Sequence, residues 1–96
     1  MIKVMYMMAF ATFRNERMKT DDEWADDAKR LLRAEMTRRG VTYDGLTERL
    51  AALGIDDSAV NIRNKVARGK FSAVFLLQAL QALGCRNLRL GEGDDD

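Results

Sequence analysis

Four helix start signals, each followed by a glycine, divide most of this chain into short segments. The start signals are hydroxyl or acidic residues: Thr20, Thr42, one of Asp56, Asp57 and Ser58, and Ser72. The glycines that follow them are Gly40, Gly54, Gly69 and Gly84. Side chains of the first kind accept hydrogen bonds from the unpaired N–H groups of a first helical turn, and glycine commonly ends a helix. The pattern predicts helices over about 20–40, 42–54, 58–67 and 73–83.

The composition also favours helices. Ala and Leu together number 23, Ile and Val together number 8, and Pro is absent, which suits helices better than strands. A chain of 96 residues, 47% apolar and 32% charged, is expected to form one soluble domain. We predict an all-α fold, a compact four- to five-helix bundle over residues 20–90. A disordered or strand-like arm over 1–19 would precede it, and an acidic disordered tail over 91–96 would follow it.

The apolar residues recur at helical spacing and define a candidate core. Each of them falls on the apolar stripe of its predicted helix. The predicted core consists of Leu31, Leu32, Leu46, Leu50, Leu53, Ile62, Val66, Leu76, Leu77, Leu80 and Leu83, with Trp24 also expected inside.

The residue types that most familiar catalysis needs are missing. The chain has no His and a single cysteine, Cys85, which excludes a His-based triad, a Cys/His zinc site and an intrachain disulfide. Cys85 follows a helix stop in an apolar context, so we expect a small buried hydrophobe. We predict no enzymatic activity, metal, cofactor or small-molecule ligand. The apolar stretch near the start is shorter than the roughly 20 residues of a membrane span, and we expect a cytoplasmic protein.

The formal net charge of +1 conceals a basic middle. Residues 28–90 carry twelve basic and five acidic side chains, a net +7, whereas residues 21–27 sum to −5 and residues 91–96 to −4. A basic body between acidic segments is typical of a polyanion-binding domain, in which an acidic tail competes with the ligand. Acidic residues at a helix start also complement the helix dipole, so charge alone leaves both interpretations open.

One side of the predicted helix over 58–67 carries residue types suited to reading DNA. At about 100° per residue, the polar residues that share this side are Asn61, Asn64, Lys65 and Arg68. Asn pairs with an adenine edge and Arg with a guanine edge in the major groove, and Lys contacts phosphate or guanine. No acidic residue interrupts 58–70. Arg63 lies within the opposite, apolar arc. An ordinary solvated helix face is the alternative interpretation.

Two resemblances bear on function. The segments VTYDGLTERL and NKVARGKFSAVFLLQALQALG resemble the phage-repressor-like (Cro/C1, or XRE) helix-turn-helix family, most specifically in ARGKFS before a Leu-rich helix. The likeness implies a lambda-repressor-like fold, double-stranded DNA as the partner and a role in transcription regulation. The positions that it implies face DNA are Thr42, Tyr43, Asn61, Asn64, Lys65 and Lys70, to which the helix-face argument adds Arg68.

The second resemblance is closer and carries no activity. WADDAKRLLRAEMTRRGVTYDGLTERL together with NIRNKVARGKFSAVFLLQALQALGCRNLRL is similar to a family of small bacterial proteins of unknown function. Within the repressor likeness, Tyr43 stands where a DNA-contacting Gln is common. The segments from Leu50 to Gly54 and from Val60 to Gly69 are each about three residues longer than the usual spacing.

The helix over 73–83 has a second apolar face, which predicts a homodimer. Its residues carry no charge, and an element that is apolar nearly all round is expected to be buried. The face opposite the predicted core consists of Val74, Phe75, Gln78, Gln81 and Ala82. The alternative to a DNA-binding function is a non-enzymatic protein-interaction domain, an adaptor or antitoxin-like partner, on the same helical scaffold; an enzyme ranks last.

Overall fold

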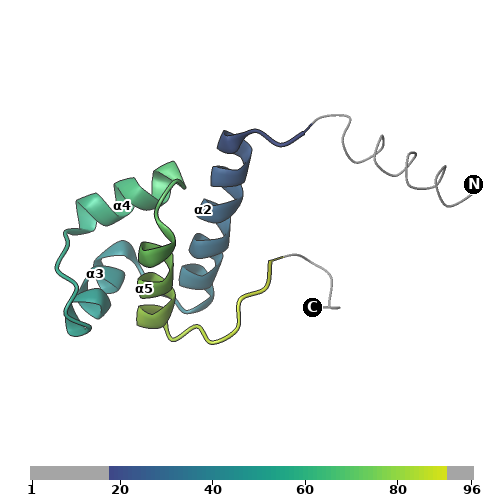
Figure 1. Cartoon of the computed structure of the whole chain (residues 1–96). Helices are drawn as coiled ribbons and strands as arrows, with labels where there is room; N and C mark the ends of the chain where they lie inside the picture. Colours follow the sequence, from purple (N-terminus) through teal and green to yellow (C-terminus); the bar gives the residue numbers. More distant parts are fainter. Residues whose placement is uncertain (1–17, 91–96) are drawn as a thin grey trace, which may run out of the picture.

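The computed structural model describes residues 18–90, and these form an all-helical domain (Figure 1). Its helices are α2 (Asp21–Arg38), α3 (Tyr43–Ala52), α4 (Ala59–Arg68) and α5 (Ala73–Leu83). The all-α prediction is confirmed, and this part of the chain contains four helices. The predictions for the arm and the acidic tail fall mainly on residues 1–17 and 91–96, which lie outside the described residues.

The four predicted helix starts are confirmed in atomic detail. Thr20 and Glu23 form a capping box, in which the Glu23 N–H donates to Thr20 Oγ1 at 3.1 Å and the Thr20 N–H donates to Glu23 Oε1 at 2.9 Å. Of the three candidates before α4, Ser58 is the cap. The hydroxyls of Thr42, Ser58 and Ser72 each accept a backbone N–H three residues on. The four glycines expected to stop these helices all have positive φ.

The core forms because two helices pack against two others. α2 and α3 each contact both α4 and α5, and Figure 1 shows α5 between α2 and α3. The largest fully buried side chains come from α2, α3 and α4 and are all predicted core residues: Leu32, Leu46, Leu50, Ile62 and Val66. Hydrophobic burial of these side chains holds the domain together.

Three predicted core positions are wrong. Leu53 is 47% exposed, Leu77 66% and Trp24 59%. Leu53 lies just past the end of α3, and Trp24 lies in the first turn of α2 beneath the Lys19 ammonium, 4.1 Å from the centre of its ring. Because α5 is apolar nearly all round, its periodicity does not determine which side faces inward. The helix turns Phe75 and Ala79 into the core and leaves Leu77 in solvent.

Gly69 connects α4 to α5 at a point where the chain passes very close to α2. A Cβ added at Gly69 would lie 2.0 Å from the carbonyl oxygen of Ala25, and its φ is +69°. Both facts require glycine there. The close approach fixes the end of α4 against the first half of α2.

Candidate nucleic-acid interface

The polar side of α4 faces solvent. Ile62 and Val66 anchor the opposite side in the core, and Asn61, Asn64 and Arg68 are all exposed. The structure therefore places these three predicted DNA-contacting residues together on one accessible helix face. Val60, 59% exposed, borders them.

Two of the predicted cations are engaged by carboxylates. The ammonium of Lys65 lies 2.9 Å from Oδ2 of Asp57, which precedes α4. It also lies 4.9 Å from the centre of the Phe75 ring of α5. The hydrogen bonds from Lys65 and from the Ser58 N–H, with a smaller contribution from the Asn61 side chain, hold the pKa of Asp57 below its ordinary value despite partial burial. The ammonium of Lys70 lies 3.0 Å from Asp22, whose hydrogen bond and charge raise the pKa of Lys70. These lysines are less available to DNA than the sequence suggested.

Arg63 occupies the other flank of α4 and was not among the predicted contact residues. Its guanidinium carbon lies 5.5 Å from the centre of the Tyr43 ring at the start of α3. From α2, Arg33 Nε donates a hydrogen bond to Tyr43 Oη at 3.0 Å. The one sequence signal for Arg63 was the position of a cation within the apolar arc of α4. We call Arg33, Tyr43 and Arg63 the phenol cluster.

The phenol cluster lines an open groove between α2, α4 and the start of α3. The groove has a volume of about 380 Å³. Besides the cluster, it is lined by Met36, Thr37, Val41, Thr42 and Asp44. Thr42 was predicted to contact DNA, and its hydroxyl accepts the Gly45 N–H at 3.1 Å as the cap of α3. The groove thus combines two guanidiniums, a helix N-terminus and one exposed carboxylate.

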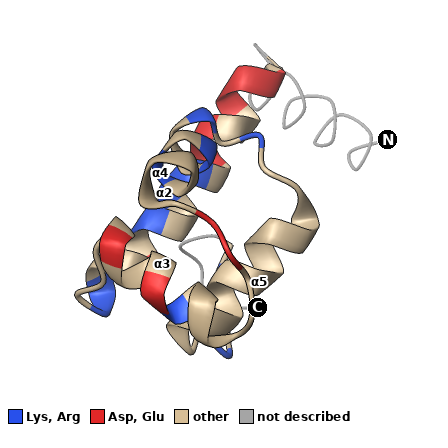
Figure 2. Ribbon diagram, turned by 90° about the vertical axis from the view of Figure 1, so that its left-hand side faces the viewer, with Lys and Arg blue, Asp and Glu red and all other residues tan. Residues whose placement is uncertain are grey.

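The cations of the domain divide into paired and unpaired sets. Within residues 18–90, ion pairs engage Lys19, Lys29, Arg30, Arg38, Arg39, Lys65 and Lys70. Over the same residues, the arginines with no carboxylate within ion-pairing distance are Arg33, Arg49, Arg63, Arg68 and Arg86. Figure 2 shows basic residues on α2 and α4, and no charged residue on α5. Three of these unpaired arginines lie on α2 and α4, whereas Arg49 lies on α3 and Arg86 follows α5.

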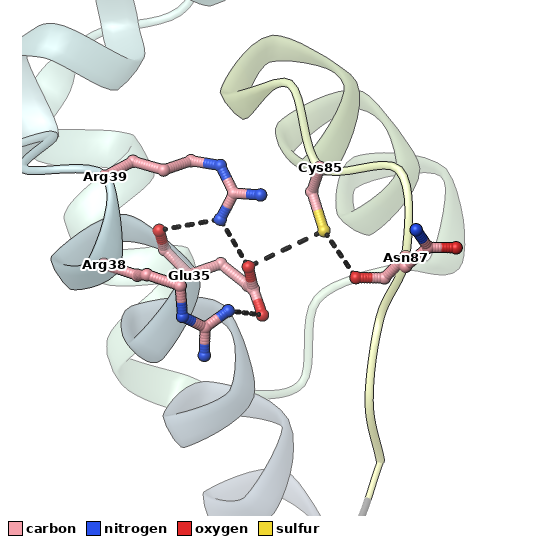
Figure 3. A network of polar contacts seen from close by, with 5 residues as sticks. All are labelled: Glu35, Arg38, Arg39, Cys85 and Asn87. Atoms are coloured by element: carbon pink, nitrogen blue, oxygen red, sulfur yellow. Dashed lines mark hydrogen bonds and ion pairs between the residues drawn. The ribbon is translucent and has the colours of Figure 1, made fainter. Parts of the chain in front are cut away.

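A second arginine cluster, built around a buried carboxylate, joins α2 to the segment after α5 (Figure 3). Glu35, only 3% exposed, accepts hydrogen bonds from Arg39 and, at 2.7 Å, from Arg38. The Cys85 thiol lies 3.7 Å from Glu35 Oε1 and 3.3 Å from the Asn87 carbonyl oxygen. Burial opposes ionisation of Glu35, but the two arginines outweigh it and hold the pKa below its ordinary value of 4.5. We call this set the carboxylate cluster.

The expectation for Cys85 needs correction. Its thiol is only half-buried, because it packs on the edge of the core and donates to polar partners. Among the described residues, no three His, Cys, Asp or Glu side chains are placed to hold a metal ion. None of the described helices is long and apolar enough to cross a membrane.

The predicted interface on α5 also changes. Val74 is 63% exposed and Gln81 is exposed, but Gln78 and Ala82 are half-buried and Phe75 is 6% exposed. The placement of Phe75 on an open face is therefore wrong: its ring packs within the chain, 5.6 Å from that of Phe71. The large apolar side chains that α5 leaves in solvent are Val74 and Leu77.

The comparison with protein families identifies the chain as a member of one of them. Residues 24–88 match a domain of unknown function, the family DUF6471, and the chain belongs to this family. The resemblance to a family of unknown function is confirmed to that extent. No curated protein and no solved structure matches the chain.

Proposed function

We propose that this domain binds double-stranded DNA sequence-specifically, with α4 as the recognition helix, and that it regulates transcription. The observation that carries the proposal is the exposed side of α4, where Asn61, Asn64 and Arg68 lie on a helix whose two arginines form no ion pair among residues 18–90. No acidic residue occurs in α4 to repel a phosphate backbone. An α-helix fits the major groove of DNA.

Each exposed residue type has a defined role in this proposal. The amides of Asn61 and Asn64 pair with adenine edges, and Arg68 binds a guanine edge or a phosphate. Thr42 and Tyr43, at the start of α3, line the groove beside Arg63 on the other flank of α4. Lys65 and Lys70 reach phosphate only by exchanging their present partners Asp57 and Asp22, so we assign them secondary roles.

Two chains binding one site form part of this proposal. A single short helix reads few base pairs, and a two-fold dimer reads two half-sites about one helical turn apart. Val74 and Leu77 provide exposed apolar surface on α5, which has no charged residue. Sedimentation equilibrium of the wild type and of Leu77→Glu tests it: we expect a dimer and a monomer, and a monomeric wild type at micromolar concentration contradicts dimerisation.

A protein-interaction domain is the second candidate, favoured by the same two exposed side chains of α5. In that case Val74 and Leu77 contact a different protein, and the polar side of α4 stays solvated. The two functions differ in salt dependence, because a DNA-binding protein releases counterions and loses affinity steeply as salt rises.

The experiment is a selection of binding sites from random duplexes, followed by titrations at several salt concentrations. Replacing both Asn61 and Asn64 with Ala should cost about ten-fold or more on the selected site and little on unrelated DNA, since each good base contact contributes about 1–3 kcal/mol. Gln81→Ala, an exposed amide on α5, is the matched control. Equal binding of the wild type and the double variant to the selected site contradicts the recognition-helix assignment.

A further inference from the structure

The phenol cluster brings two cations from different helices to one neutral ring. Arg33 comes from α2 and reaches the hydroxyl of Tyr43, while Arg63 comes from α4 and lies over the ring face. Tyr43 is half-buried and packs against the core. The ring therefore holds both guanidiniums at the groove while contributing no negative charge of its own.

The charge of this groove is largely uncompensated. Neither Arg33 nor Arg63 has a carboxylate within ion-pairing distance among residues 18–90, whereas Arg38 and Arg39 share the carboxylate of Glu35. Asp26 of α2 interacts with the charge of Arg33 at longer range, but its ion pairs are with Lys29 and Arg30. Of the residues that the structure describes, Asp44 is the acidic one that lines the groove, and it is exposed. The N-terminus of α3, capped by Thr42, adds partial positive charge on the same side. An anion entering the groove meets more positive than negative charge.

The donors in the groove suit a phosphate. A guanidinium presents a planar fork of N–H donors that matches phosphate oxygens, and two such forks can share one phosphate. Arg33 uses Nε on Tyr43, which leaves its terminal nitrogens to bind. The groove is open, so it can receive a phosphate that remains part of a long strand.

We infer that Arg33 and Arg63 bind one phosphate of a DNA strand, with Tyr43 positioning both guanidiniums. The inference rests on the proposed function and deepens it. Arg63 precedes Asn64 in α4 and is about 100° away from it around the helix, so a strand held by Arg63 runs along the flank of α4 next to Asn64. Phosphate binding at this groove thereby sets the depth and direction in which α4 enters the major groove.

The test combines protein variants with a neutralised strand. Affinity for the selected duplex is measured by fluorescence anisotropy with Arg33→Gln/Arg63→Gln, and with duplexes that carry one neutral methylphosphonate at each position in turn. We expect the double variant to lose about ten-fold or more in affinity, and its salt slope to become shallower by about one unit. One methylphosphonate position should weaken the wild type and have no further effect on the variant.

Arg49→Gln/Arg86→Gln is the matched control, because it removes the same charge from exposed arginines outside the groove. Circular dichroism verifies that both variants fold. If the wild type binds the selected duplex and the groove variant binds it equally well with an unchanged salt slope, the phosphate site is refuted and the proposed function stands. If no duplex is selected and binding is insensitive to salt, the proposed function itself fails.

Titrations with inorganic phosphate and with a deoxynucleoside monophosphate separate a strand phosphate from a free one. The Arg Nε–H signals are followed by NMR in the wild type and the groove variant. Weak binding of free phosphate at this groove, together with the methylphosphonate coupling, supports the inference. Tight binding of the monophosphate without any methylphosphonate coupling overturns it in favour of a free-anion site.

Discussion

The domain contains two arginine pairs in opposite electrostatic environments, and each pair includes a residue of α2. In the carboxylate cluster, Arg38 and Arg39 surround the buried carboxylate of Glu35. In the phenol cluster, Arg33 and Arg63 surround the uncharged ring of Tyr43. The central group determines the role of the arginines. A carboxylate neutralises their charge and uses it to stabilise the fold, whereas a phenol does not neutralise it, so the charge can bind a ligand.

The carboxylate cluster connects the end of α2 to the segment after α5. Glu35 is almost completely buried, and its oxygens receive donors from α2 and the thiol of Cys85 after α5. A buried carboxylate is costly unless it is paired and hydrogen-bonded, so the cluster is stable only when these donors are in place. The segment that follows α5 is thereby tied to the end of α2.

The largest effect that we expect is on stability, in the carboxylate cluster. Glu35→Gln should lower the free energy of unfolding by about 2 kcal/mol, since hydrogen bonds to a charged group contribute roughly 1.5–3 kcal/mol. Its affinity for the selected duplex should stay within two-fold of the wild type at a temperature where both are folded. Urea denaturation and anisotropy measure the two quantities. If Glu35→Gln has the unfolding free energy of the wild type, the carboxylate cluster does not stabilise the fold.

The pH dependence of that difference should follow the carboxylate. The pKa of Glu35 is lowered in the folded protein from its ordinary value of 4.5, so ionisation stabilises the fold. This contribution is fully present above the unfolded pKa and is lost as the pH falls through the lower folded pKa. The wild type and Glu35→Gln should therefore converge in urea midpoint as the pH drops from 7 toward 3. The other carboxylates are common to both proteins, so a constant gap over this range contradicts the assignment.

Placing a carboxylate at the centre of the phenol cluster tests whether the charge of the central group sets the role of the two arginines. Tyr43→Glu places a carboxylate between Arg33 and Arg63, which should reduce affinity for the selected duplex about ten-fold or more, or roughly 1.4 kcal/mol. Tyr43→Gln also removes the ring but introduces a neutral side chain of the same size as Glu. It should therefore bind DNA more tightly than Tyr43→Glu. Equal affinities of the two variants would show that the central charge is unimportant.

The smallest effect concerns the phenol hydroxyl alone. Tyr43→Phe keeps the ring beneath Arg63 but removes the acceptor of the Arg33 hydrogen bond. We expect an affinity loss of about three-fold, with unfolding stability changed by less than about 1 kcal/mol. Anisotropy and urea denaturation check both. If Tyr43→Phe binds DNA with wild-type affinity, the hydrogen bond from Arg33 to the phenol does not contribute to binding, and the ring positions only Arg63.

Much of the fold was predictable because its signals are local. Thr20 with Glu23, and Ser72 with Gly84, specify helix ends through hydrogen bonds and backbone angles within a few residues. The rotation of α5 was not predictable, since Phe75 and Leu77 are both apolar and only packing against other helices decides which is buried.

The candidate site was predictable only on one helix. The period of α4 placed Asn61, Asn64 and Arg68 correctly on its exposed side. The pairing of Lys70 with Asp22 and the meeting of Arg33 with Arg63 depend on contacts between residues far apart in the sequence. Periodicity within one helix carries no information about such contacts.

The most direct test of the central claim is an NMR titration of the isotope-labelled protein with the selected duplex. It observes both arginine clusters and every helix in a single experiment. The account predicts that the largest shift changes occur at the exposed side of α4 and at the side chains of Arg33 and Arg63, with Arg38 and Arg39 unchanged. Changes confined to α5 or to the carboxylate cluster, with α4 unaffected, would contradict it.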